Sequence, residues 1–137
     1  MDTDAWKPVA APGFMEVVGP LLKSRQPNES NTYGLLTDQR HANAIGIVHG
    51  GVITTLLDQA IAIVAWNAAD RQPTVTVQMD ASFLGAAKVG DFLTVRAQVR
   101  HATRSLMFLD AEVFSGDAAI ARATAIMKVA KMTGTSA

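Results

Sequence analysis

Residues 50–67, GGVITTLLDQAIAIVAWN, determine the architecture of this chain. The stretch is apolar almost all the way round a helix, and a helix of that kind lies inside a core. It is too long for an ordinary strand, and its alanines and leucines favour helix over the β-branched residues mixed among them. The sequence therefore predicts one long central helix over residues 52–67, directly after the glycine pair.

The residues that follow this helix change to a period of two. Residues 74–83 and 93–100 alternate apolar and polar side chains, which indicates two half-buried strands. In the first strand, Val75 and Val77 are expected on the apolar face and Thr76 on the polar face.

Two further strands are expected nearer the carboxyl end. Residues 105–114 give a less regular strand, and residues 118–129 give another, in which four alanines share one face. These alanines are Ala119, Ala121, Ala123 and Ala125. Their small side chains allow the helix and the sheet to approach closely.

Only a few residues separate each of these strands from the next. Parallel strands need crossovers of a dozen or more residues, so the sheet is predicted to be an antiparallel meander. Nothing else in the chain could cover the apolar helix, so the sheet is expected to wrap it. The fold class is therefore α+β, and residues 1–137 fit a single domain.

The amino-terminal part adds smaller elements. Phe14, Val17, Val18 and Leu21 stand at helical spacing, so a short amphipathic helix is predicted over about residues 12–22, where it would pack as a lid. Residues 32–36 indicate a weak strand.

Composition restricts the function. Twelve basic residues balance twelve acidic ones, so no net field attracts nucleic acid or an anionic membrane. The absence of cysteine excludes disulfides and thiolate nucleophiles, and His41, His49 and His101 lack the spacing of a metal site. The amino terminus lacks the apolar stretch of a secretory signal, and the longest apolar run, residues 60–66, is too short to span a bilayer. We expect a cytoplasmic protein without a metal.

Asp58 is the feature that folding does not explain. It is the only ionisable side chain between Gly50 and Ala69. Aspartate is a poor helix-interior residue, and burial of its unpaired charge is costly. The carboxylate is therefore either a structural group facing a crevice or a loop, or a functional group.

The segment His49-Gly50-Gly51 is the second clue. Paired glycines before a helix allow close backbone approach, and free N–H groups there favour a developing negative charge, although a tight turn would also explain them. Asp58 is eight residues past Gly50, about 12 Å along a helix axis, so the two groups cannot meet within one helix. A shared reaction centre requires Asp58 of one subunit to face Gly50 of another, as in a symmetric dimer.

Residues 41–58, HANAIGIVHGGVITTLLD, resemble the signature of the hotdog-fold acyl-CoA thioesterases, and in particular the PaaI-like branch of the 4-hydroxybenzoyl-CoA thioesterase superfamily. Asn43, His49-Gly50-Gly51 and Asp58 stand at the family's spacings, and the likeness extends over about residues 31–129. The resemblance implies a sheet wrapped around a central helix. It also implies a homodimer joined edge to edge with shared active sites, and a dimer of dimers.

The resemblance implies a reaction as well: hydrolysis of an aromatic or medium-chain acyl-CoA to a carboxylic acid and CoA, without a cofactor. Asp58 would activate water or attack the thioester itself, and Asn43 of the other subunit would orient that water. The N–H of Gly50 would stabilise the oxyanion. His49 would shape the loop by hydrogen bonding, and Thr76 would stand near the water.

Other residues are expected to hold the substrate. Gly51 belongs to the loop that binds it. Arg104, Lys88 and Arg122 are the candidates for the CoA phosphates, because arginine and lysine bind phosphate well. The apolar side chains at positions 14, 21 and 66 belong either to the acyl pocket or to the core.

Two other functions are compatible with parts of this pattern. A hotdog dehydratase or hydratase would use a His–acid pair, which the placement of His49 and Asp58 fits poorly. A non-catalytic acyl-CoA-binding module would have no need for Asp58.

Overall fold

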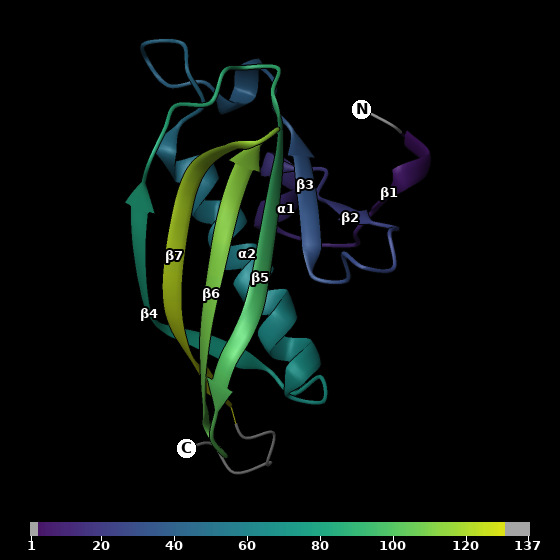
Figure 1. Cartoon of the computed structure of the whole chain (residues 1–137), viewed down its shortest axis with the longest axis vertical. Coiled ribbons are helices and arrows are strands. Elements are labelled where there is room, and N and C mark those ends of the chain that lie inside the picture. Colours follow the sequence, from purple (N-terminus) through teal and green to yellow (C-terminus); the bar gives the residue numbers. More distant parts are fainter. Residues whose placement is uncertain (1–2, 131–137) are drawn as a thin grey trace.

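The computed structural model describes residues 3–130, in which one seven-stranded sheet curves around a long helix (Figure 1). The helices are α1 (Phe14–Val18) and α2 (Gly50–Ala68), with short 3-10 turns η1 (Thr3–Ala5) and η2 (Gln39–His41). The strands are β1 (Trp6–Pro8), β2 (Leu22–Ser24), β3 (Thr32–Leu36), β4 (Thr74–Phe83), β5 (Phe92–Ala102), β6 (Leu106–Ser115) and β7 (Ala118–Val129). The predicted α+β class, the central helix and the strand at residues 32–36 are confirmed.

All strand pairs are antiparallel, as predicted, and the order across the sheet is β1-β2-β3-β5-β6-β7-β4. Strands β5, β6 and β7 form the expected meander. The prediction was wrong for β4, which pairs with β7 at the far edge. Its connection to β5, residues 84–91, passes over the ends of β6 and β7 (Figure 1). At about 3.3 Å per residue this connection is long enough to cross three strand spacings of about 4.8 Å.

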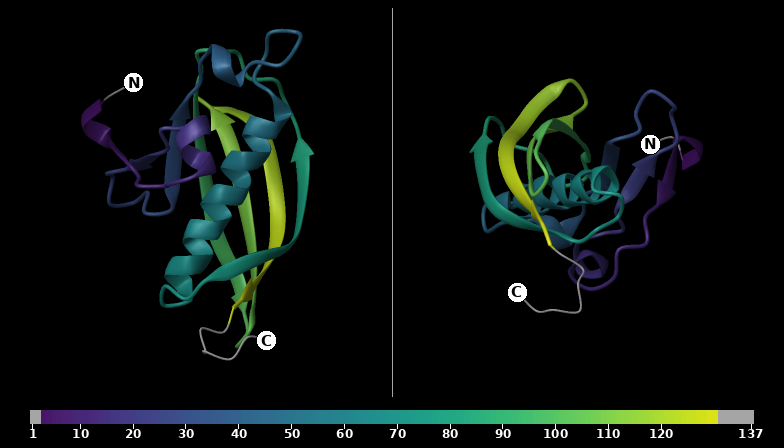
Figure 2. Two further views of the ribbon diagram at one scale, coloured as in Figure 1. Left: turned by 180° about the vertical axis from the view of Figure 1, so that it is seen from behind. Right: turned by 90° about the horizontal axis from the view of Figure 1, so that it is seen from below.

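One side of α2 packs against the concave face of the sheet (Figure 2). Its buried side chains are Ile53, Leu56, Leu57, Ala60, Ile61, Val64 and Ala65. They join the inward side chains of β5, β6 and β7 in one core. By length and composition α2 is also apolar enough to cross a membrane. Its packing against the sheet explains this composition, because a core helix is equally apolar.

Strand β4 contains a β-bulge that changes which side chains face the helix. Its register with β7 shifts between Thr76 and Gln78, so Val77 is the extra residue. Thr76 lies opposite the buried Met127, whereas Val75 lies opposite the exposed Lys128. The prediction that Thr76 lies on the polar face was therefore wrong. The extra residue shifts the side-chain alternation by one, which brings Thr76 to the helix side.

A similar irregularity corrects the predicted alanine face of β7. Ala121, Ala123 and Ala125 are buried as expected, but Ala119 is exposed. The register between β6 and β7 shifts at this point, and the neighbouring Ile120 is buried instead. Alternation read from sequence fails where a strand gains one residue.

The amino-terminal helix is shorter than predicted. α1 ends at Val18, and Leu22 already belongs to β2. Proline disfavours a helical conformation in the preceding residue and provides no N–H, so Pro20 explains why the helix stops before it. The short strands β1 and β2, which were not predicted, extend the sheet beyond β3.

Candidate active site

Asp58 and Thr76 form the polar centre on the open side of α2. The Thr76 hydroxyl donates a hydrogen bond to Oδ1 of Asp58 at 3.0 Å. Asp58 is half-buried and Thr76 is exposed, so substrate or water can reach the pair. The contact exists because the β4 bulge turns Thr76 toward the helix. Among residues 3–130, Oδ1 accepts this bond and no group donates to Oδ2, so Oδ2 can accept a proton from water.

The start of α2 has an ordered arrangement of N–H groups. The Gly51 N–H donates to the His49 ring at Nδ1, 2.7 Å away. The N–H groups of Val52 and Ile53 donate to the His49 carbonyl at 2.9 and 3.4 Å. His49 therefore caps the helix through its ring, and its part in a reaction stays a prediction.

The N–H of Gly50 differs from its neighbours. Within the part of the chain that the structure describes, no group accepts a hydrogen bond from it. It lies at the positive end of the helix dipole, where a developing negative charge is stabilised. This is the geometry expected of an oxyanion site.

The two glycines serve different purposes. A Cβ added to Gly51 would stand 3.0 Å from Nδ1 of His49, so the capping ring would have to shift by a few tenths of an ångström. A Cβ added to Gly50 would meet only the Phe83 ring, at 3.6 and 3.9 Å, which is ordinary contact. The fold of one chain therefore does not require glycine at position 50. A substrate or partner subunit that approaches this backbone closely would require it.

Asn43 lies in the loop beside this helix end. A bridge between Ala42 and Val48 closes the loop, and Oδ1 of Asn43 accepts the N–H groups of Ile45 and Ile47, both at 3.1 Å. The side-chain oxygen is thus used within the loop. The amide NH₂ remains as the donor that could orient a water or a carbonyl.

The candidate residues fall into two groups separated along α2. Asp58 and Thr76 form one group, and Asn43, His49 and the Gly50 N–H form the other. The groups are eight helix residues apart, about 12 Å along the axis. No single thioester carbonyl could contact both within one chain.

The three basic candidates lie in different places. Lys88 lies at the Gly50 end, because it forms a bridge with Ile47. Arg104 lies in the turn between β5 and β6, at the opposite end of the sheet. Arg122 stands between Ser82 and Glu112 on the sheet face that points away from α2. Of these three residues, Lys88 alone lies near either half of the site within one chain.

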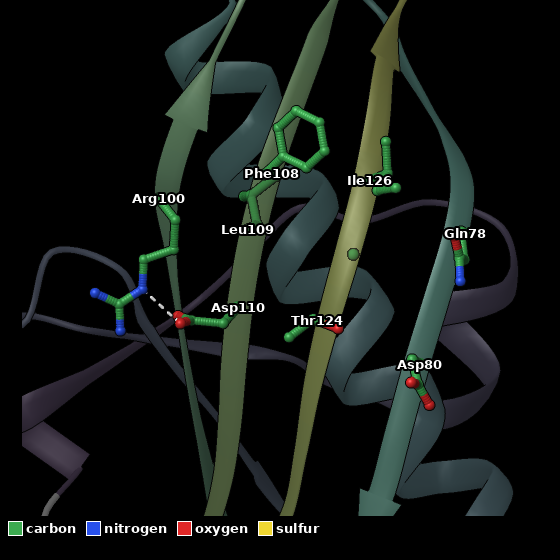
Figure 3. A pocket seen from close by; sticks show the side chains of 9 residues that line it. Gln78, Asp80, Arg100, Phe108, Leu109, Asp110, Thr124 and Ile126 are labelled. Atoms are coloured by element: carbon green, nitrogen blue, oxygen red, sulfur yellow. Dashed lines mark hydrogen bonds and ion pairs between the residues drawn. The ribbon is translucent and has the colours of Figure 1, made fainter.

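A separate pocket of about 360 Å³ lies on the outer face of the sheet (Figure 3). The ion pair between Arg100 and Asp110 and the ring of Phe108 line it. Apart from the buried Leu109 and Ala125, the side chains that line this pocket point away from α2, and the pocket contains neither half of the candidate site.

The three histidines occupy unrelated positions. His41 is buried, and its Nε2 donates to the Val18 carbonyl at 2.6 Å. His49 caps α2, and His101 lies against Phe108 at a ring distance of 5.9 Å. Each ring therefore has a separate structural environment.

An apolar cavity beside Asp58 contains side chains that the sequence left ambiguous. Phe14 and Trp66 line it and are 65% and 41% exposed, so they are not core residues, whereas Leu21 is buried. Gln59 and Thr74 also line the cavity and were not predicted. Gln59 follows Asp58 in the sequence and Thr74 stands two residues before Thr76, and this proximity could have identified both as site residues.

Comparison with known proteins identifies the family to which this chain belongs. The family model of the thioesterase superfamily matches residues 45–121, more than half of the chain. The Pseudomonas aeruginosa protein PA0474, provisionally named an esterase, is 30% identical over 114 residues, which cover 82% of this chain and 85% of that protein. Acyl-coenzyme A thioesterase 13 of Mus musculus is 26% identical over 103 residues, 74% of this chain and 73% of that one.

Solved structures show the same fold. A hypothetical thioesterase of Streptococcus pneumoniae, crystallised with coenzyme A, has a TM-score of 0.68 at 26% identity over 72% of this chain and 78% of that one. The PaaI protein of the E. coli phenylacetic acid degradation operon has a TM-score of 0.67 at 22% identity over 73% and 72%. The chain therefore belongs to the thioesterase superfamily, with the hotdog fold and the PaaI-like relatives that its motif indicated.

Proposed function

We propose that this protein hydrolyses an aromatic or medium-chain acyl-CoA to a carboxylic acid and CoA, at sites shared between two subunits. One observation carries the proposal. The carboxylate of Asp58 and the unpaired N–H of Gly50 are both accessible, yet they lie about 12 Å apart along one helix. A two-fold axis between antiparallel α2 helices would bring the carboxylate of one subunit opposite the N–H of the other.

The chemistry follows from the groups present. Oδ2 of Asp58 takes a proton from water while the water oxygen bonds to the thioester carbon. The carbonyl electrons move to oxygen, where the Gly50 N–H stabilises them, a contact worth about 3 kcal/mol. The tetrahedral intermediate then collapses, the C–S bond breaks, and the CoA thiolate takes up the proton that Asp58 accepted, which restores the carboxylate. Thr76 fixes the carboxylate, and the Asn43 NH₂ orients the water.

The edge strand β4 supports the proposed dimer. It pairs only with β7 among the described residues, and Val75 and Val77 are 52% and 57% exposed on it. A long exposed edge with apolar side chains readily pairs with another strand. Pairing of β4 with its copy would place α2 helices side by side. A dimer of dimers is the larger assembly that we propose from the resemblance.

The proposed CoA contacts rest on charge and position. Lys88 lies beside the Gly50 end and is exposed, so its ammonium could meet a phosphate as the thioester reaches the helix start. Arg104 of the partner subunit would contact a CoA phosphate if the dimer brings opposite ends of the two sheets together. Arg122 would contact one only if CoA extends onto the outer face of the sheet. The coenzyme A bound to the Streptococcus pneumoniae relative supports this ligand class.

Thiol release from a panel of CoA esters tests the proposal. The panel contains phenylacetyl-, 4-hydroxybenzoyl- and octanoyl-CoA, and the Asp58→Asn variant should lower kcat by orders of magnitude with a small change in KM. One turnover in ¹⁸O water distinguishes the roles of Asp58, because direct attack would label the aspartate and water attack would label only the product acid. Binding of esters without turnover would instead indicate a binding module.

A further inference from the structure

The cavity next to Asp58 has a consistent chemical character. Its volume is about 500 Å³, and the amino-terminal segment and the second half of α2 form its walls. Figure 2 shows α1 lying alongside α2 on the side opposite the sheet. The apolar side chains of Phe14, Met15, Ala62, Ile63 and Trp66 line it, and none of its lining residues carries a charge.

The cavity opens beside the polar centre. Gln59 follows Asp58 directly, and Ala62, one turn further along α2, lies on the same side as Asp58. Thr74 stands two residues before Thr76 and shares its face of β4. A group leaving the reaction centre along α2 toward its carboxyl end would therefore enter the cavity.

The wall opposite α2 is held in place. The Val9 N–H donates to the Leu21 carbonyl at 2.9 Å. The guanidinium of Arg40 donates to the carbonyls of Val17 and Gly19, both at 2.8 Å, at the end of α1. The same side chain hydrogen-bonds Asp38 and lowers the pKa of that carboxyl. The wall is thus connected to η2, directly before the loop that carries Asn43.

From these observations we propose that the cavity binds the acyl group, and that it selects an unsubstituted apolar chain of medium length over a hydroxylated aromatic ring. This inference rests on the proposed function. The volume exceeds by about threefold the roughly 150 Å³ that holds benzene. Apart from Gln59, Thr74 and the indole N–H of Trp66, the lining offers no side-chain partner for a ring hydroxyl, whose burial without one is unfavourable.

Chain-length preference provides the test. Wild-type kcat/KM should rise from butanoyl-CoA to octanoyl-CoA by about two- to fourfold per methylene, and 4-hydroxybenzoyl-CoA should be poorer than octanoyl-CoA. Ala62→Phe fills the cavity and should lower kcat/KM for octanoyl-CoA at least tenfold, and by a larger factor than for butanoyl-CoA. Ala68→Phe, at an exposed position on the same helix outside the cavity, is the matched control.

A second variant avoids any packing defect. Phe14→Ala removes an exposed wall residue and should lower the octanoyl-to-butanoyl ratio at least threefold, while Val17→Ala, equally exposed on α1 but outside the cavity, should not change it. An unchanged octanoyl-to-butanoyl ratio of kcat/KM in both Phe14→Ala and Ala62→Phe would refute the assignment of the cavity as the acyl pocket. It would leave the proposed thioester hydrolysis unaffected. Octanoyl-CoA binding that weakens in Ala62→Phe, without turnover of any ester, would uphold the pocket and overturn the proposed reaction.

Discussion

Replacing Gly50 with alanine separates the function of this glycine from its structural role. The added methyl group would contact the Phe83 ring at 3.6 Å, which is ordinary packing, and the backbone N–H would remain. Alanine is favoured over glycine in helices by up to about 1 kcal/mol. The Gly50→Ala variant should therefore have an unchanged Tm or one raised by a few degrees.

Its activity should respond in the opposite direction. A methyl group beside the N–H increases the distance of closest approach for a carbonyl oxygen. Losing an oxyanion contact altogether costs about 100- to 1000-fold in kcat. Because the N–H itself remains, we expect a fall in kcat/KM of at least about tenfold, toward that limit.

The adjacent substitution is the contrasting control. A methyl group at Gly51 would stand 3.0 Å from Nδ1 of His49, so the capping ring would have to shift by a few tenths of an ångström. Weakening of a helix cap costs up to about 2 kcal/mol, against a gain of up to about 1 kcal/mol from alanine in a helix, so Gly51→Ala should have a lower Tm than Gly50→Ala. Thermal denaturation and thiol release on both variants complete the comparison. Full kcat/KM in a stable Gly50→Ala protein would refute the oxyanion assignment.

Substitutions at three further positions test other parts of the account. Thr76→Val removes the hydrogen bond to Asp58 and should lower kcat about tenfold, whereas Thr76→Ser should retain most activity; equal activity of the two would remove Thr76 from the site. Val77→Asp places a charge on the β4 edge and should give an inactive monomer by gel filtration, and an active monomer would contradict the shared site. Lys88→Ala should raise KM for CoA esters with little change in kcat, an effect that weakens as salt increases.

The parts of the fold that follow from local pattern were predictable. The apolar run of α2 and the alternation in the long strands identified both layers, because each pattern reflects burial of one face. The β4 bulge was not predictable from alternation, because nothing in the residue types around Val77 marks it as the extra residue. The bulge nevertheless reverses which side chains on one side of Val77 point toward the helix. Placing β4 beside β7 depends on a loop path over the sheet end, which short connections do not specify.

The candidate site shows the same division. Asp58 was identifiable because a charge in an apolar helix needs a reason, and the distance to Gly50 indicated two subunits. The exposure of Phe14 and Trp66 depends on how the amino-terminal segment packs on α2, which periodicity does not determine. The different requirements of Gly50 and Gly51 appeared only with the position of the His49 ring.

A subunit-mixing experiment tests the shared active site most directly. Asp58→Asn and Gly50→Ala subunits are each expected to form dimers of low activity. When they are unfolded together, mixed in equal amounts and refolded, half of the dimers should contain both kinds of subunit, and each of these should have one intact site. The mixture should then regain about a quarter of wild-type activity. Activity that stays at the level of the two parent variants would show that each chain holds a complete site, and would contradict the account.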